Sequence, residues 1–218
     1  MTLEEPILLH VETSIHGRVL VSTPSSQPAA GTLVGFHGYA ENASIQLERM
    51  VQLELSDWCL CSVQALHPFY TRANGQVVSN WMTRLDRELA IRDNLAYVAE
   101  AIRRVNTCWA KTPRLVFCGF SQGAAMAYRA AVHHAGPKAG VIAVGGDIPP
   151  ELDGEELGRV QSVLIARGSG DRHYPAPQME EDLQRLSQAG IPATTFSHGG
   201  AHDWPEALTP EIRRYLLR

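Results

Sequence analysis

The sequence predicts an α/β fold with a mostly parallel sheet and helices on both of its faces. Apolar, β-favouring segments alternate with helical segments through most of the 218 residues. The chain is long enough to bury one sizeable core, and no linker, internal repeat or low-complexity tract divides it. We therefore expect a single domain over residues 1–218.

The first elements are expected to be strands. Residues 7–13 and 18–23 flank the turn-like sequence Ile15-His16-Gly17 and predict an N-terminal antiparallel hairpin. Residues 32–36 and 58–65 form two compact apolar runs. Such runs are typical of the buried strands of a parallel sheet.

Two helices and one long loop complete the first half of the chain. Asn42 is a suitable N-cap for a helix that reaches about Leu55. The longest irregular stretch follows at residues 67–82, and its 16 residues are too few for a cap domain. An apolar stripe at steps of four and three then predicts the clearest helix, with the members Ile91, Leu95, Val98, Ile102 and Val105.

The second half continues the alternation. Residues 115–118 predict a buried strand, and the alanine-rich residues 124–132 predict a helix packed closely on the sheet. Further strands are expected at residues 140–144, 163–166 and 193–196, and further helices before Gly190 and at residues 210–217.

A pentapeptide joins the strand at residues 115–118 to the helix that follows it. Gly119-Phe120-Ser121-Gln122-Gly123 fits the G-x-S-x-G nucleophile elbow, in which a sharp turn projects the serine out of the sheet. The alternative is a turn serine without chemistry, and partner residues elsewhere in the chain decide between the two.

Loops at the carboxyl ends of the strands supply partners for Ser121. In parallel sheets these loops carry the chemistry, and here they offer Asp171 and His202. A serine hydroxyl needs an imidazole to take its proton and a carboxylate to orient that imidazole. Ser121, His202 and Asp171 can fill these three roles, with Asp147 after the preceding strand as an alternative acid.

These motifs resemble the phospholipase/carboxylesterase family of α/β-hydrolases, which includes the acyl-protein thioesterases. The resemblance covers residues 32–217 and depends on His37-Gly38, the Ser121 pentapeptide, Gly170-Asp171 and Gly200-Ala201-His202, with support from Trp81 and Gly145-Gly146-Asp147-Ile148-Pro149. It implies an α/β-hydrolase fold without a cap domain and the activity of a serine esterase or thioesterase.

The chain departs from the family pattern at three places. Ala124 stands where a third glycine is usual, and Tyr39 stands where an aliphatic residue is usual. Bulky Arg172, His173 and Tyr174 replace small apolar residues after the acid. These departures concern acyl-chain specificity and leave the hydrolase chemistry unchanged.

The tetrahedral intermediate of such a reaction needs two hydrogen-bond donors for its oxyanion. In this fold they are the backbone N–H of the residue after the nucleophile and one N–H from the loop after an early strand. These residues are Gln122 and Tyr39. His37 is expected to hold that loop by hydrogen bonds, and Asp203 is expected to point away from the ring of His202.

Large side chains near these loops are candidates for the substrate pocket: Trp81, Tyr174 and Trp204, together with Tyr39, Tyr70 and Met82. For Trp81, Trp204, Tyr39, Tyr70 and Met82, ordinary core packing is the alternative. Without a cap domain, the pocket should be a shallow cleft that buries little of a long acyl chain. We therefore expect a preference for short to medium acyl chains, from acetyl to about hexanoyl.

Composition narrows the class of protein. The net charge is −4, and no Lys/Arg cluster interleaves with aromatic residues, so nucleic acid is not an expected partner. The acidic N-terminus and the lack of a long apolar run predict a cytoplasmic protein without stable membrane insertion. The histidines and the four cysteines lack metal-ligand spacing, so we expect no metal or cofactor and interpret the cysteines as reduced core thiols.

The sequence thus predicts a serine hydrolase that cleaves carboxylic esters or thioesters through an acyl-enzyme intermediate. Two other classes stay open: a serine peptidase or amide hydrolase on the same fold, and a hydrolase-fold binding protein without turnover. Burst kinetics with an ester and with an aminoacyl amide separates the three.

Overall fold

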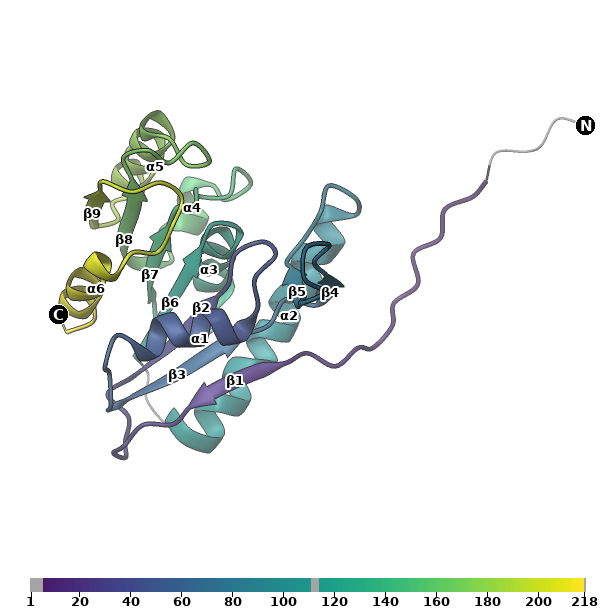
Figure 1. Cartoon of the computed structure of the whole chain (residues 1–218), viewed down its shortest axis with the longest axis horizontal. Coiled ribbons are helices and arrows are strands. Elements are labelled where there is room, and N and C mark those ends of the chain that lie inside the picture. The colour runs from purple at the N-terminus through teal and green to yellow at the C-terminus, as the bar shows by residue number, and fades with distance from the viewer. Residues whose placement is uncertain (1–5, 111–113, 218) are drawn as a thin grey trace, which may run out of the picture.

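The computed structural model describes residues 6–110 and 114–217 of the chain. Strands and helices alternate along it (Figure 1). The strands are β1 (Val19–Ser22), β2 (Gly31–Phe36), β3 (Trp58–Val63), β4 (His67–Tyr70), β5 (Val77–Asn80), β6 (Leu115–Phe120), β7 (Ala139–Val144), β8 (Val160–Gly168) and β9 (Ala193–His198). The α-helices are α1 (Ala43–Val51), α2 (Arg87–Val105), α3 (Gln122–His133), α4 (Gly154–Leu157), α5 (Ala176–Gln188) and α6 (Thr209–Leu216).

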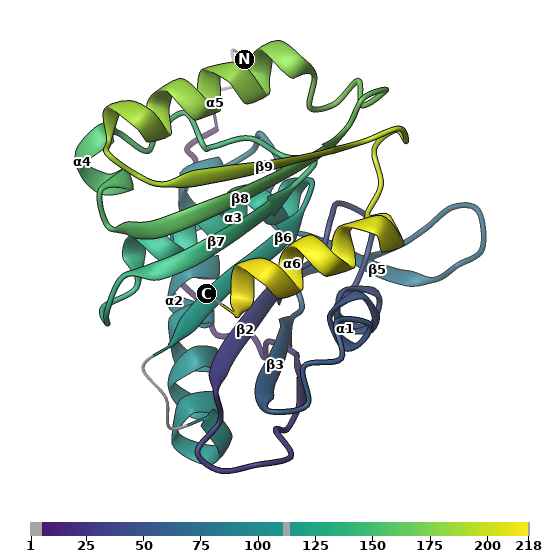
Figure 2. The ribbon, with the colours of Figure 1, turned by 90° about the vertical axis from the view of Figure 1, so that its left-hand side faces the viewer.

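Seven strands form one sheet in the order β1-β3-β2-β6-β7-β8-β9. β1 runs antiparallel to β3, in a register that pairs Val19 with Val63, and the other pairings in this sheet are parallel. Figure 2 shows α6 in front of the sheet and α2 and α3 behind it. The predicted α/β class with a mostly parallel sheet is confirmed.

Each face of the sheet is covered by its own apolar layer. One layer joins the sheet to α2, α3 and α5 through residues such as Val98, Met126 and Leu186. The other layer joins it to α1 and α6 through Met50 and Ile212. Because both faces are buried, the central strands consist almost entirely of apolar residues, as the sequence predicts.

The predicted N-terminal hairpin does not form, so this prediction is wrong. Residues 6–18 contain no strand, and β1 pairs with β3 instead. Gly17 lies so close to α2 that a Cβ there would stand 2.0 Å from a ring carbon of Tyr97. The Tyr97 hydroxyl also donates to the Arg18 carbonyl at 2.7 Å. These contacts lead the chain across α2 into β1, and the expected turn at residues 15–17 does not form.

The stretch at residues 67–82, predicted to be irregular, contains a small second sheet. β4 and β5 pair antiparallel, with His67 opposite Asn80. Ser79 of β5 also bonds to the loop after β2: its N–H donates to the Glu41 carbonyl at 2.8 Å, and its carbonyl accepts from Ala40 at 3.1 Å. The hairpin therefore braces the loop that leaves the carboxyl end of β2.

Two further observations bear on the environment of the protein. Within the described ranges, no helix has both the length and the apolar character needed to cross a bilayer. Cys59, Cys61 and Cys118 are buried free thiols, as predicted. Cys108 is exposed, which corrects its interpretation as a core residue.

Candidate active site

Three of the predicted site residues follow three parallel strands of the sheet. Ser121 comes directly after β6, Asp171 follows β8 and His202 follows β9. The carboxyl ends of parallel strands lie at one edge of a sheet, so the topology brings loops from distant parts of the sequence together. The structure places all three side chains in contact at this edge.

Ser121 stands at a strained turn between β6 and α3. Its backbone angles are φ 54° and ψ −121°, which a non-glycine residue rarely adopts. A Cβ on Gly119 would lie 2.0 Å from the Gly123 carbonyl oxygen, and a Cβ on Gly123 would lie 2.1 Å from the Phe36 carbonyl oxygen. Only glycine fits at these two positions, which is why the turn can be so sharp.

A chain of hydrogen bonds joins the three side chains. The distance from Ser121 Oγ to His202 Nε2 is 2.8 Å, and the distance from His202 Nδ1 to Asp171 Oδ2 is also 2.8 Å. The backbone N–H groups of His173 and Tyr174 donate to Asp171 Oδ1 at 2.8 and 3.0 Å. Burial alone would raise the pKa of Asp171, but these donors and His202 hold it below its ordinary value.

Two nearby carboxylates stay outside this chain. Asp147, the alternative acid, is exposed after β7, while the His202 nitrogen that would face an acid is bonded to Asp171. Asp203 lies 3.4 Å from His198 and points away from the His202 ring, as predicted. The geometry therefore favours Asp171 over Asp147 as the partner of the imidazole.

The loop after β2 presents an unused backbone donor at Tyr39. The N–H of Gly38 donates to the Glu41 carboxylate at 2.8 Å, and the N–H of Ala40 donates to the Ser79 carbonyl at 3.1 Å. The N–H of Tyr39, between them, donates to no acceptor among the described residues. This pattern leaves Tyr39 free to donate to a bound group, which is what the predicted oxyanion site requires.

Gln122 offers the second predicted donor and has an additional role that the sequence did not indicate. Its backbone N–H, at the start of α3, also finds no acceptor in the described part of the chain. Its side chain accepts from the Trp81 N–H at 2.9 Å and donates to the Met82 carbonyl at 2.9 Å. The side chain therefore anchors the loop before α2 to the nucleophile turn.

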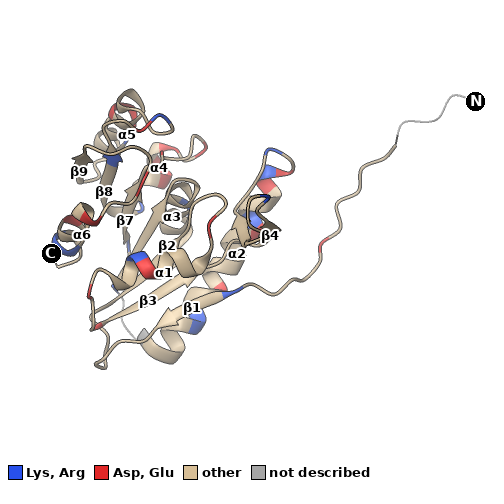
Figure 3. Ribbon diagram, viewed as in Figure 1, with Lys and Arg blue, Asp and Glu red and all other residues tan. Residues whose placement is uncertain are grey.

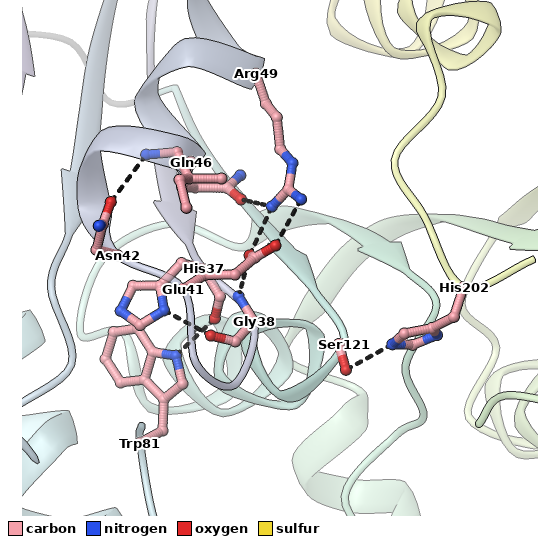
Figure 4. Close-up of polar contacts among 10 residues, drawn as sticks. His37, Gly38, Glu41, Asn42, Gln46, Arg49, Trp81, Ser121 and His202 are labelled. Atoms are coloured by element: carbon pink, nitrogen blue, oxygen red, sulfur yellow. Dashed lines mark hydrogen bonds and ion pairs between the residues drawn. The ribbon is translucent and has the colours of Figure 1, made fainter. Parts of the chain in front are cut away.

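A partly buried ion pair supports the loop after β2 (Figure 4). Arg49 of α1 donates to both oxygens of Glu41 at 2.7 Å, and its guanidinium lies 4.7 Å from the centre of the Phe120 ring. Burial alone would raise the pKa of Glu41, but Arg49 and the Gly38 N–H hold it below its ordinary value. The carboxylate thus stays charged while it holds the Gly38–Tyr39 peptide.

His37 is fixed as a neutral ring within the same loop. Its Nε2 accepts from the Ala65 N–H at 3.1 Å, so its Nδ1 carries the proton that bonds to the Gly38 carbonyl at 2.7 Å. Burial lowers the pKa of His37. The prediction that His37 holds the loop by hydrogen bonds is confirmed.

Two of the predicted pocket residues are buried in the core instead. Trp81 donates its ring N–H to the His37 carbonyl at 2.9 Å, and Tyr174 donates its hydroxyl to Asp182 of α5 at 2.8 Å. Buried tyrosine and tryptophan need such partners, and here those partners lie beneath the loops. Trp204 remains half-buried, 5.7 Å from the Arg49 guanidinium.

A cavity of about 400 Å³ opens beside Ser121. Its walls come from the loop before α2, from α3, from the loop after β7 and from the acid loop. The lining residues are Met82, Thr83, Arg84, Arg87, Ser121, Gln122, Ala125, Arg129, Gly145, Gly146, Asp147 and His173. None of the predicted tryptophan or tyrosine side chains is among these lining residues, which corrects the expected aromatic cleft.

Several of these residues were not predicted from the sequence. Glu41 and Arg49 are eight positions apart and meet only because α1 turns between them. Arg129 lies in the alanine-rich helix α3, among side chains that are otherwise mostly apolar. A charged residue within an apolar helix face is the signal that could have identified Arg129.

Comparison with known proteins places this geometry in context. Residues 19–207 match the family described as phospholipase/carboxylesterase, whereas no curated protein sequence matches the chain. Among solved structures, esterase PE8 is similar over 93% of this chain and 99% of its own, with 22% identity and a TM-score of 0.71.

Two further solved structures share the fold. A phospholipase/carboxylesterase from Dyadobacter fermentans matches 96% of this chain and 100% of its own, with 20% identity and a TM-score of 0.70. Acyl-protein thioesterase 2 from Zea mays matches 93% and 98%, with 17% identity and a TM-score of 0.69. At such identities these similarities establish the α/β-hydrolase fold.

Proposed function

The chain belongs to the phospholipase/carboxylesterase family, an enzyme family of the carboxylesterase and thioesterase type, and from this premise we propose that it cleaves esters or thioesters with a Ser121–His202–Asp171 triad. The observation that carries the proposal is the continuous hydrogen-bonded chain from Ser121 Oγ through His202 to Asp171. Each group in that chain has the partner that its role requires.

The first half of the reaction is acylation of Ser121. His202 Nε2 takes the hydroxyl proton as Oγ attacks the substrate carbonyl, and Asp171 stabilises the imidazolium that forms. The backbone N–H groups of Tyr39 and Gln122 stabilise the oxyanion of the tetrahedral intermediate. His202 then returns the proton to the leaving alcohol or thiol, and the acyl group remains on Ser121.

The second half of the reaction releases the acid. A water molecule attacks the acyl carbonyl while His202 takes its proton, and the same backbone donors stabilise the second oxyanion. The proton returns to Ser121 Oγ as the carboxylic acid leaves. Because acylation and deacylation use the same groups, the loss of any one of them should slow both halves.

The cavity supports a small substrate. A volume of about 400 Å³ lies at the lower end of ligand pockets and suits acyl chains from acetyl to about hexanoyl. The buried free thiols of Cys59, Cys61 and Cys118 support the cytoplasmic location that the sequence predicts.

Replacement of Ser121 tests the proposal. Ser121→Ala should lower kcat for p-nitrophenyl butyrate about 10⁴-fold, because triads lose most of their rate with any one member. Ser44→Ala, an exposed serine on α1, is the matched control and should keep wild-type kcat. Near wild-type turnover by Ser121→Ala would reject the nucleophile. Faster turnover of an aminoacyl amide than of the ester would point to the peptidase alternative.

A further inference from the structure

Three arginines line the cavity that contains Ser121. Arg84 and Arg87 come from the loop before α2 and its first turn, and Arg129 comes from the third turn of α3. Figure 3 shows basic residues at this end of α2. Met82 and Ala125 are the larger apolar side chains of the lining, and the predicted aromatic residues do not contribute to it. The guanidinium groups are the feature of this lining that a purely hydrocarbon acyl chain would not use.

Arg129 is a buried member of the cavity lining. Gln122, Ala125 and Arg129 follow at steps of three and four, so they lie along one face of α3, and all three line the cavity. The Arg129 side chain is only 2% exposed. Its Nε and one terminal nitrogen bond to Glu151 at 2.7 Å, but its other terminal nitrogen is buried without an acceptor in the described part of the chain.

The charges around the cavity do not cancel. Glu151 is shared between Arg129 and Arg87, which it meets at 3.2 Å. Arg84 forms no hydrogen bond or ion pair with any residue that the structure describes. Asp147 contributes one more carboxylate to the lining. Three guanidinium groups therefore face two carboxylates, and at least two of the three keep nitrogens available for another acceptor.

A buried guanidinium N–H without an acceptor is costly. Burial also lowers the pKa of Arg129, and its pair with Glu151 only partly opposes this effect. An oxyanion in the cavity would give Arg84 and Arg87 a partner, and one that reached Arg129 would satisfy its remaining donor. Charge-assisted bonds to arginine are stronger than neutral hydrogen bonds. No residue that the structure describes accepts a hydrogen bond from this Arg129 nitrogen.

We propose that the substrate is an ester or thioester that carries a carboxylate or another oxyanion a few atoms from the scissile carbonyl, bound by Arg84, Arg87 and Arg129. This inference rests on the proposed function, because it assigns the cavity beside Ser121 to the substrate. The cavity volume of about 400 Å³ keeps the anion and the reacting carbonyl within one small molecule.

Two pairs of esters test the proposal, one for each side of the scissile bond. On the acyl side, the mono-p-nitrophenyl ester of adipic acid is compared with its neutral methyl ester. On the alcohol side, the acetyl ester of meta-hydroxybenzoic acid is compared with the corresponding methyl benzoate. At low salt, the anionic member of at least one pair should have a kcat/KM about tenfold higher, a difference of about 1.4 kcal/mol.

Variants locate the effect. The double variant Arg84→Ala, Arg87→Ala should lower kcat/KM for the preferred anionic ester about tenfold and leave that for its neutral partner within about twofold. Arg92→Ala, an exposed arginine on α2 outside the cavity, is the matched control and should change neither. Added salt should reduce the preference, because exposed charges are screened.

The results separate this inference from the proposed function. If both pairs favour the neutral ester in a Ser121-dependent reaction, or if the double variant lowers both members equally, the anion site is rejected and the hydrolase stands. If no ester is cleaved, calorimetry on Ser121→Ala decides: monomethyl adipate should bind at least about tenfold more tightly than dimethyl adipate. Equal binding of the two would reject the anion site independently of turnover.

Discussion

The two sides of Ser121 are built in opposite ways. On one side, the loop after β2 is held by hydrogen bonds within the protein: Gly38 donates to Glu41, Glu41 pairs with Arg49, and His37 is fixed at both ring nitrogens. On the other side, among the residues that the structure describes, exposed Arg84 has no partner and Arg129 has a buried nitrogen without an acceptor.

This difference separates chemistry from recognition. Donors that stabilise an oxyanion are effective because they are fixed before the reaction begins, and hydrogen bonds within the supporting loop supply that rigidity. A recognition surface has the opposite requirement, since donors already satisfied within the protein have nothing to offer a ligand. The unsatisfied side is therefore where we place substrate selection.

Replacement of the two candidate acids, Asp171 and Asp147, should produce the largest difference in kcat between the two sides of Ser121. Asp171→Asn should lower kcat about 10⁴-fold, because an amide no longer holds the correct tautomer of His202. Asp147→Asn should change kcat for a neutral ester by no more than about threefold, since exposed charges contribute little, and should raise kcat/KM for the anionic ester. Steady-state kinetics on both esters makes the comparison, and the reverse ranking of the two variants would move the acid to Asp147.

Loss of the Glu41–Arg49 ion pair beside the loop after β2 should have the next largest effect on kcat. Glu41→Gln removes the charge that both Arg49 and the Gly38 N–H need, so the Tyr39 donor should lose its alignment. We expect kcat to fall about 10- to 100-fold with little change in KM, less than the loss of a whole oxyanion donor. Glu48→Gln, exposed on the same helix, is the control. Equal losses in the two variants, or a change confined to KM, would contradict a positioning role.

The loop that carries Asp171 is supported by the buried carboxyl of Asp182, which bonds to Tyr174. This contact should make the free energy of unfolding depend on pH. Asp182 accepts from the Tyr174 hydroxyl at 2.8 Å and from the Ile148 N–H at 3.2 Å, and burial raises its pKa to about 6. The folded chain thus keeps the proton to a higher pH than the unfolded chain. The free energy of unfolding therefore falls as pH rises from about 4 to about 6 and stays lower above that range.

Urea unfolding of wild type and Asp182→Asn at pH 5 and pH 7 measures this contribution. The wild type should lose about 1 kcal/mol more than the variant between these values, because only the carboxyl titrates. Glu181→Gln, on the exposed side of α5, should behave like wild type. Identical pH dependence in wild type and Asp182→Asn would show that Asp182 does not titrate in this range.

The parts of the site that were predictable from sequence depend on local rules. Ser121 has to stand at its turn because Gly119 and Gly123 permit no side chain there, and a G-x-S-x-G sequence reports that requirement directly. Asp171 and His202 followed from the order of strands, since the carboxyl ends of parallel strands share one edge. Local geometry and topology thus identified Ser121 and His202, whereas they left Asp147 open beside Asp171 as the acid.

The parts that were not predictable depend on partners distant in sequence. Trp81 and Tyr174 are aromatic residues beside the site, but acceptors at His37 and Asp182 draw them into the core. The N-terminal hairpin failed for a similar reason, because β1 pairs with β3. No sequence pattern encodes which of two distant partners a strand or a ring will choose, since the choice depends on the packed structure.

A covalent acyl group on Ser121 during turnover is the central feature of the proposed mechanism. Wild-type protein quenched in acid during turnover of p-nitrophenyl butyrate, then digested and examined by peptide mass spectrometry, tests this. We predict a butyryl group on the peptide that contains Ser121, located on Ser121 itself by fragmentation. A butyryl group on a different residue, or an unmodified Ser121 in protein that is turning the ester over, would contradict the account.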